Sequence, residues 1–255
     1  MRNLAELFEM VTLATIGVGM FLENFFTQSG DKYSFSKQQG SDFAKEIAGD
    51  FNPLHDPDNN RFCIPGDLLF SLTSCKYGIS QNMTFDFQGM VSGDSQVHFV
   101  ENEDQIRVEN DNQKSFLAMT REGDNTQDTA FVEALVRSYV AFSGKTFPHI
   151  IVELMKEEGV MVNPVKPMVI YDMMKLGFEK FSEHTPEVVL KQSRFDVNGK
   201  RGMVIMDFDI CANDEVIGHG EKQIIMSGLR PYDQEGIDVL VNNYDQSRER
   251  FFANA

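Results

Sequence analysis

The sequence predicts an α+β protein in which one small unit, a helix followed by an antiparallel sheet, occurs twice. Helical periodicity and strand periodicity alternate along the chain, and short turns between alternating apolar and polar residues mark antiparallel meanders. The order of a helix and then strands occurs at about 40–120 and again at about 168–228. The two segments share no close sequence repeat, so the repetition is one of element order.

The composition is that of an ordinary globular protein. Its 255 residues are 42% hydrophobic and 24% charged, which suffices for one large or two small domains with a buried core. The net charge of −16 at pH 7 argues against nucleic acid or an anionic membrane as the main partner. The three cysteines, Cys63, Cys75 and Cys211, lack metal-binding spacing and favour reduced thiols, so we expect a cytoplasmic protein.

The first residues are predicted to form an N-terminal extension, residues 1–30. The apolar run at 10–22 is too short to span a bilayer and lacks the basic flank of a signal peptide. A buried helix or strand is one interpretation of this run, and a start at Met20 is the other. In both cases we expect residues 1–19 to be dispensable to the fold.

The first helix-plus-sheet unit is predicted at residues 31–125. A helix over 41–48, with Ser41 as a fair N-cap, must end before Pro53, and a second, buried helix is expected over 66–78. Alternating residues then predict strands. These strands are centred on residues 83–87, 97–99, 106–108 and 116–118.

Residues 126–165 are predicted to be a helical connection, because helical periodicity runs from 129 to 160. The second unit, residues 166–230, is predicted to begin with a helix over 168–182. Strands then follow on both sides of Asn198-Gly199, a two-residue hairpin signal. Residues 231–255 are predicted to form a C-terminal helix.

One heptad carries the strongest chemical signal, because it places an acid and a histidine on a single stiff turn. Histidine titrates near neutral pH, and an aspartate can share a water molecule with it if partial burial raises the carboxyl pKa. Gly66, eleven residues further on, opens an apolar helix whose first N–H groups can bind an oxyanion. The combination suits addition of water to a double bond beside a thioester carbonyl. The heptad reads Gly49-Asp50-Phe51-Asn52-Pro53-Leu54-His55.

Other interpretations of this region weigh against a catalytic site. A helix end with a turn-forming Asn-Pro pair and an exposed histidine explains the heptad without function. A calcium loop is a second alternative, since Asp56, Asp58 and Asn60 have the spacing of its first three ligands. Arg61 stands where that loop needs glycine, and Pro65 disturbs its exit, so no metal is expected.

The remaining histidines and cysteines indicate no further site. Cys63 and Cys75 have no neighbouring histidine pattern for nucleophilic chemistry. The other histidines are scattered, and each is more often a solvated or hydrogen-bonded residue than a ligand. They are His98, His149, His184 and His219.

The heptad, together with Pro65-Gly66-Asp67-Leu68-Leu69 and Ser74, resembles the MaoC-like (R)-specific enoyl-CoA hydratases, and the whole chain looks like a bacterial branch of that family. The resemblance covers about residues 33–90. It implies a hotdog fold, in which a long central helix is wrapped by an antiparallel sheet. For two such units in one chain it implies a double hotdog, with one site where the units meet.

The resemblance also implies roles for individual residues. Asp50 and His55 match the pair that orients and deprotonates water, and Gly66 matches the residue whose N–H binds the thioester oxygen. Ser74 matches a serine that hydrogen-bonds within the site, and Asn52 belongs to the same motif. Such enzymes hydrate trans-2-enoyl thioesters to (R)-3-hydroxyacyl thioesters, or run the reverse dehydration. No cofactor is expected beyond the coenzyme A or acyl carrier protein thioester that is the substrate.

Two departures from the family pattern support a second hypothesis. The segment between His55 and Gly66, which in the family helps to shape the acyl tunnel, is shorter here. Asp67 puts a carboxylate beside the expected oxyanion site, which suits the helix macrodipole but opposes a second negative charge there. The alternative is a non-catalytic hotdog protein that binds an acyl thioester or another small ligand. A homodimer would fit either hypothesis.

Overall fold

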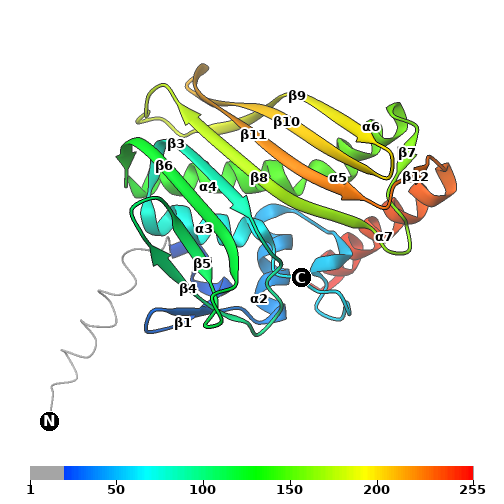
Figure 1. Ribbon diagram of the computed structural model, residues 1–255, viewed down its shortest axis with the longest axis horizontal. Coiled ribbons are helices and arrows are strands. Elements are labelled where there is room, and N and C mark those ends of the chain that lie inside the picture. The colour runs from blue at the N-terminus through cyan, green and yellow to red at the C-terminus, as the bar shows by residue number, and fades with distance from the viewer. Residues whose placement is uncertain (1–19, 255) are drawn as a thin grey trace, which may run out of the picture.

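One antiparallel sheet of ten strands runs through the protein, whose computed structural model describes residues 20–254 (Figure 1). The strand order is β1-β2-β4-β5-β6-β3-β8-β11-β10-β9. β3 pairs with β8 at the centre, so the sheet is continuous across the two halves of the chain. The strands are β1 (Thr27–Ser29), β2 (Lys32–Ser34), β3 (Ile79–Phe87), β4 (Gln96–Glu101), β5 (Ile106–Glu109), β6 (Ser115–Thr126), β8 (Met168–Phe178), β9 (Glu187–Asn198), β10 (Arg201–Ala212) and β11 (Glu215–Ser227), with β7 (Val160–Met161) and β12 (Arg230–Pro231) forming a separate pair.

Two long helices, α3 and α4, lie side by side against one face of this sheet (Figure 1). α3 packs under the strands of the first half, and α4 contacts β9 in the second half. The fold is therefore a double hotdog. The helices are η1 (Met20–Phe25), α2 (Lys37–Asp42), η2 (Phe43–Ala48), η3 (Pro53–His55), α3 (Gly66–Tyr77), α4 (Thr129–Gly144), α5 (Thr146–His149), α6 (Ile151–Glu157) and α7 (Gln234–Asn254).

The predicted helix over 168–182 is wrong, because residues 168–178 form strand β8. Apolar residues recur there at helical spacing, but the buried ones, Met174, Leu176 and Phe178, alternate as in a strand. The pairing of β8 with β11 shifts register between Gln223 and Ile224, and such a bulge breaks the period of two on which strand prediction depends.

The helix of the second half is consequently α4, which lies in the segment predicted to be a connection. That segment forms three helices, α4 to α6, followed by the short strand β7. Strands β3 to β6 and β9 to β11 and the helices α3 and α7 lie about where periodicity predicts them, whereas the short strands β1, β2, β7 and β12 were not predicted. The hairpin expected at Asn198-Gly199 joins β9 to β10, with Asn198 paired to Arg201 and Gly199-Lys200 as its loop. The limits predicted for the two units, 31–125 and 166–230, stay a prediction.

A core of aromatic rings joins the two halves. The Phe70 ring on α3 lies 5.0 Å from that of Phe85 on β3 and 4.9 Å from that of Tyr139 on α4. Tyr139 in turn lies 5.6 Å from Phe208 on β10. All four side chains are fully or almost fully buried, so α3 and α4 bury one common apolar surface.

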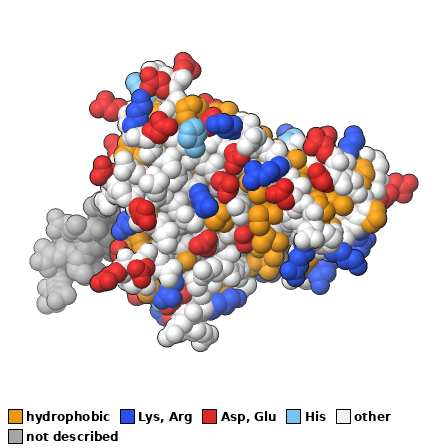
Figure 2. All heavy atoms as spheres, turned by 45° about the horizontal axis from the view of Figure 1, so that its top comes forward, with side chains coloured by type: hydrophobic (Ala, Val, Ile, Leu, Met, Phe, Trp, Pro, Cys, Tyr) orange, Lys and Arg blue, Asp and Glu red, His pale blue; other side chains and the backbone are white. Residues whose placement is uncertain are grey.

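Part of the predicted N-terminal extension belongs to this core. Leu22, Phe25 and Phe26 are buried, and Phe25 packs edge-on against Phe43. Residues 1–19, predicted to be dispensable, lie outside the described residues. Among residues 20–254, no helix is long and apolar enough to cross a membrane. On the face seen in Figure 2, acidic and basic side chains are interspersed.

Candidate active site

The heptad forms a turn whose hydrogen bonds are local. Gly49 ends η2 with φ at +64°, a left-handed conformation that glycine adopts without strain. The Asp50 N–H then donates to Ala44 O (2.8 Å), and one Asp50 carboxylate oxygen accepts from the Asn52 N–H (2.9 Å). Asn52 Oδ1 accepts from the Leu54 N–H (3.1 Å) and so caps η3. These bonds fix the shape of the turn from which the Asp50 and His55 side chains project.

Asp50 and His55 converge. His55 Nε2 lies 3.6 Å from Asp50 Oδ2, which is ion-pair distance but longer than a hydrogen bond. His55 Nδ1 lies 2.9 Å from the Cys63 carbonyl oxygen, and because a carbonyl only accepts, Nδ1 carries a hydrogen. Nε2 therefore faces the carboxylate, and since the two groups are not directly hydrogen-bonded, an atom of a bound molecule can lie beside them and contact both.

The surroundings favour the imidazolium form of His55. Burial lowers the pKa of His55, but its contacts with Cys63 and the charge of Asp50 outweigh burial and raise the pKa from 6.5 to about 9. At neutral pH His55 is thus an imidazolium. The sequence pattern does not pair a histidine with Cys63. In the structure, residues 55–63 form one loop, which brings His55 to the carbonyl oxygen of Cys63.

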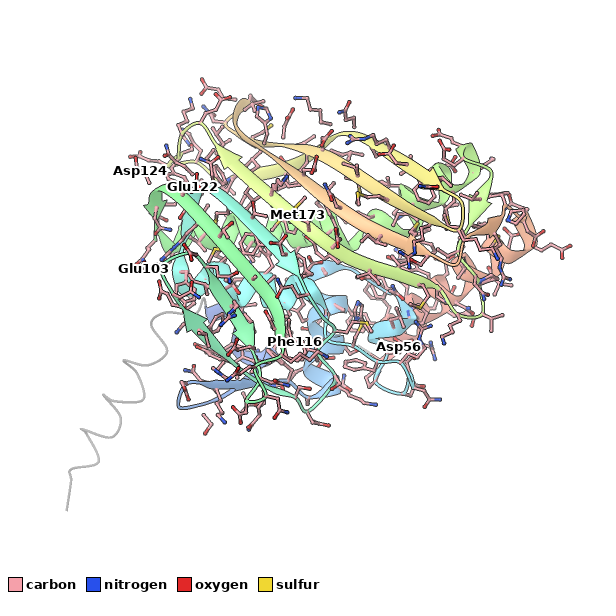
Figure 3. The ribbon with its side chains drawn as sticks, in the orientation of Figure 1. Asp56, Glu103, Phe116, Glu122, Asp124 and Met173 are labelled. Carbon is pink, nitrogen blue, oxygen red and sulfur yellow. The ribbon has the colours of Figure 1, made fainter. Side chains whose placement is uncertain are left out.

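The loop after His55 is held by the C-terminal helix α7. Asp56, which Figure 3 labels beside α7, is buried and accepts from one side chain of η2 and two of α7. A residue that the calcium-loop alternative uses as a ligand is thus already paired with cations. Its partners are Lys45 (2.8 Å), Ser247 (2.9 Å) and Arg250 (3.2 Å). Among residues 20–254, no group of three or more acidic, histidine or cysteine side chains is placed to hold a metal ion.

The pair lies at a cavity of about 390 Å³ between the two halves of the molecule. This volume is within the usual range of small-molecule sites. The polar groups come from both halves, although only the first half carries the heptad. They include Asp50, Asn52, His55, Gly66 and Asp67 from the first half, and Ser143, Tyr171 and Lys222 from the second.

Gly66 lines the cavity as the first residue of α3, so no earlier turn of the helix provides a carbonyl for its N–H. A Cβ at this position would lie 3.1 Å from the Phe87 ring and 3.4 Å from the Tyr171 ring, which explains the glycine. Ser74, predicted to belong to the site, is fully buried two turns further along α3 and is not among the residues that line this cavity.

Three charged or polar side chains form a buried group beside this helix end. The Ser143 hydroxyl, at the end of α4, donates to Asp67 Oδ2 (2.6 Å), and Lys222 Nζ, on β11, donates to the same hydroxyl. Asp67 and Lys222 are 9% and 3% exposed. Within the described residues, Asp67 Oδ1 is buried without a hydrogen-bond partner.

The charges in this group act on one another. Burial raises the pKa of Asp67, and Lys222 and Ser143 oppose the rise. Burial lowers the pKa of Lys222, while Asp67 and Asp50 oppose the fall. Lys222 also lies 4.4 Å above the Tyr171 ring, whose hydroxyl bonds that of Tyr139. Burial raises the pKa of both tyrosines well above 10.

A second, apolar cavity of about 260 Å³ adjoins the first. Its walls come from α6, α7, the segment before β8, and the heptad with the loop that follows it. The two cavities have five lining residues in common, so they are neighbours. These are Asn52, Leu54, Phe147, Ile151 and Val169.

Sequence reasoning missed Ser143, Tyr171 and Lys222. Lys222 left a usable signal, since strand alternation places it on the same face as the buried Ile224 and Met226. A lysine at such a position is rarely buried without a partner. Ser143 and Tyr171 carry no comparable signal, because the sequence does not show which way a side chain points at a helix terminus or in a bulged strand.

The sequence matches one family model over residues 20–235, that of the family described as "Protein of unknown function (DUF3581)", and the chain belongs to that family. No curated protein matches it.

Solved structures with a related fold include an acyl-CoA thioesterase II, TesB2, from Mycobacterium marinum, at 9% identity and a TM-score of 0.41, covering 84% of this chain and 99% of that one. A putative MaoC domain dehydratase from Chloroflexus aurantiacus is 8% identical, with a TM-score of 0.38 and coverages of 79% and 94%. The peroxisomal multifunctional enzyme type 2 of Drosophila melanogaster is 8% identical, with a TM-score of 0.42; the match covers 88% of this chain and 53% of that one. Likenesses this distant carry no argument about the reaction.

Proposed function

We propose that this protein is a hydratase or dehydratase that interconverts 2-enoyl and (R)-3-hydroxyacyl thioesters of coenzyme A or acyl carrier protein. The observation that supports this most is the convergence of Asp50, His55 and the start of α3 at Gly66 on one cavity. Acid, base and oxyanion donor are the three groups that the reaction requires. The resemblance of the heptad to the MaoC-like hydratases gives the stereochemistry.

The Asp50–His55 pair can carry out both proton transfers. In hydration, Asp50 accepts a proton from water while the water oxygen bonds to C3 of the enoyl group. The His55 imidazolium gives its Nε2 proton to C2, so one proton is taken up and one is released. Transfer of the captured proton from Asp50 to His55 restores the pair. The raised pKa of His55 keeps this acid loaded at neutral pH.

Negative charge develops on the thioester oxygen as C3 is attacked, and in this proposal the N–H of Gly66, which lines the cavity, binds it. Donors aimed at developing charge typically contribute a factor of about 10²–10³ in rate. The adjoining apolar cavity suits the acyl chain, since its walls are mainly aliphatic side chains and prolines. Asn59 and Arg61 of the loop after His55 also line it.

The direct test is hydration of crotonyl-CoA and of longer trans-2-enoyl-CoA substrates by the wild type, Asp50→Asn and His55→Ala. We expect an active wild type and losses of about 10²–10⁴ in kcat for each variant, the usual contribution of a positioned acid or base. A wild type that is inactive at every chain length rules the proposal out. Equal rates in all three proteins would show that the pair has no part in the reaction.

The second candidate is a non-catalytic protein that binds an acyl thioester, and the Asp67 carboxylate beside Gly66 is the observation that favours it. Calorimetric titration with a non-hydratable saturated acyl-CoA distinguishes the two. Binding to a wild type that hydrates no substrate supports this candidate, whereas binding together with turnover supports the enzyme.

A further inference from the structure

Asp67 and Lys222 are two buried charged residues at the wall of the cavity, and the acid–base pair does not use them. Taking a carboxylate and an ammonium group out of water costs several kcal/mol each, and their attraction often only offsets that cost. Asp67 and Lys222 come from opposite halves of the molecule and meet at Ser143, next to the helix end where the thioester oxygen is expected. Buried charge in a cavity is more often functional than stabilising.

The carboxylate of Asp67 is a problem for the proposed reaction. It lies in the first turn of α3, one residue after Gly66, where it cancels part of the positive field of the helix end. An enolate-like oxygen forming at the Gly66 N–H would meet a like charge at short range and in a medium of low dielectric constant. Without compensation, Asp67 would raise the barrier that the helix end lowers.

Lys222 is placed to supply that compensation. Its Nζ donates to Ser143, whose hydroxyl donates to Asp67, so a single chain of hydrogen bonds connects the cation with the carboxylate. Lys222 stands above the face of the Tyr171 ring, which fixes the ammonium group from the other side. The group as a whole, one cation and one anion, is neutral.

We propose that Lys222 is a positioning residue of the second half that acts through Ser143 on Asp67, neutralising this carboxylate so that the start of α3 can accept the oxyanion of the reaction. The inference rests on the proposed function. It gives the second half, which lacks the heptad, a specific role. The first half contributes the acid–base pair and the oxyanion donor, but also the Asp67 carboxylate, whose charge Lys222 of the second half balances.

The test compares Lys222→Met, Asp67→Asn and the double variant in the hydration assay. Lys222→Met is expected to lower kcat about 100-fold and to change KM less than threefold, because the lost field acts on the transition state. The double variant is expected to regain at least tenfold of that loss, since it removes the uncompensated charge as well. Lys175→Met, at an exposed lysine of the adjacent strand β8, is the matched control and should match the wild type.

The pH profile separates this role from a merely structural one. Groups from four places face Asp67: Lys222 on β11, Tyr171 on β8, Tyr139 and Ser143 on α4, and Asp50 with His55 in the heptad. Without Lys222, burial raises the pKa of Asp67 further, and protonation at lower pH removes the opposing charge. The hydration rate of Lys222→Met should therefore rise as pH falls. The double variant, Lys222→Met with Asp67→Asn, should show no such rise.

Each outcome decides between the proposals. If the wild type hydrates enoyl thioesters and Lys222→Met keeps its kcat, the role of Lys222 is wrong and the proposed function stands. A wild type without activity overturns both. If Lys222→Met does not fold, Asp67→Asn and the double variant are compared instead: a double variant at least 100-fold slower than Asp67→Asn would show that Lys222 acts other than through Asp67, and would overturn the inference.

Discussion

Two of the histidine–aspartate pairs among residues 20–254, Asp50–His55 in the first half and Asp209–His219 in the second, differ in the distance between the two groups and in the exposure of the histidine. In the second half, His219 Nδ1 lies 2.6 Å from Asp209 Oδ1, closer than the 3.6 Å between His55 and Asp50. The His219 side chain is nevertheless 49% exposed, against 11% for His55, and neither His219 nor Asp209 lines the cavity.

The difference teaches that proximity alone does not make an acid–base site. His219 is open to water, which competes for its hydrogen bond and screens its charge. His55 is shielded from bulk water, and it lines the same cavity as Asp50 and Gly66, the first residue of α3. Because Asp50 and His55 are not directly hydrogen-bonded to one another, both stay available to a molecule in that cavity.

The largest effect should come from removing each histidine in turn. His55→Ala is expected to lower kcat for enoyl-CoA hydration about 10²–10⁴-fold, and His219→Ala is expected to leave it unchanged. Both rates are measured after each variant has been shown to be folded. A similar loss in both variants would show that the comparison has no functional meaning.

The buried charges should dominate stability. Lys222→Met leaves Asp67 buried without its cation, and breaking a buried pair typically costs about 3–5 kcal/mol in free energy of unfolding. The double variant with Asp67→Asn should regain most of this loss. Urea denaturation measures both. A loss below about 1 kcal/mol in the single variant would mean that water already reaches the pair.

The pH dependence should distinguish the shielded pair from the exposed one. Since the pKa of His55 in the free protein is raised to about 9, kcat/KM should stay level through neutral pH and fall as pH rises through about 9, when the acid is lost. Asp50→Asn removes a charge that raises this pKa, so its alkaline limb should move to lower pH. His219→Ala should not change the pH at which the rate falls. A shift of that pH in His219→Ala would contradict the assignment of the alkaline limb to His55.

The same raised pKa links folding to pH. The His55 contribution to stability is fully present below its unfolded pKa of 6.5 and is lost as pH rises through about 9. Urea denaturation of the wild type and His55→Gln at pH 6 and pH 10 should therefore give a difference that shrinks at the higher pH.

The smallest effect should come from the hydrogen bond that ties α7 to the heptad. Tyr244 on α7 donates to the Gly49 carbonyl (3.2 Å) and is 5% exposed. Tyr244→Phe should cost about 0.5–1.5 kcal/mol in free energy of unfolding, the net value of one hydrogen bond. Tyr232→Phe, which loses only an exposed bond to Gln234, is the control and should cost nothing measurable.

The heptad could be interpreted from sequence because its geometry is local. The hydrogen bonds that shape the turn join residues no more than six positions apart, from Ala44 to Asp50 and from Asn52 to Leu54, whereas Cys63 and Tyr244 bond to the heptad from further along the chain. Glycine, asparagine and proline specify such turns through their own backbone preferences. The strand order of the second half could not be predicted in the same way, since a bulge in β8 disguised its first strand as a helix.

The sequence by itself determined the turn that carries Asp50 and His55, the start of α3 at Gly66 and the alternation of most strands, because each of these depends on neighbours within a few residues. Only the tertiary structure decided which helix serves the second half, that Ser74 stays away from the cavity, and that Lys222 meets Asp67. Ser143 is 76 positions from Asp67 and 79 from Lys222. Contacts over such separations arise from how helices and sheet pack, which local pattern does not encode.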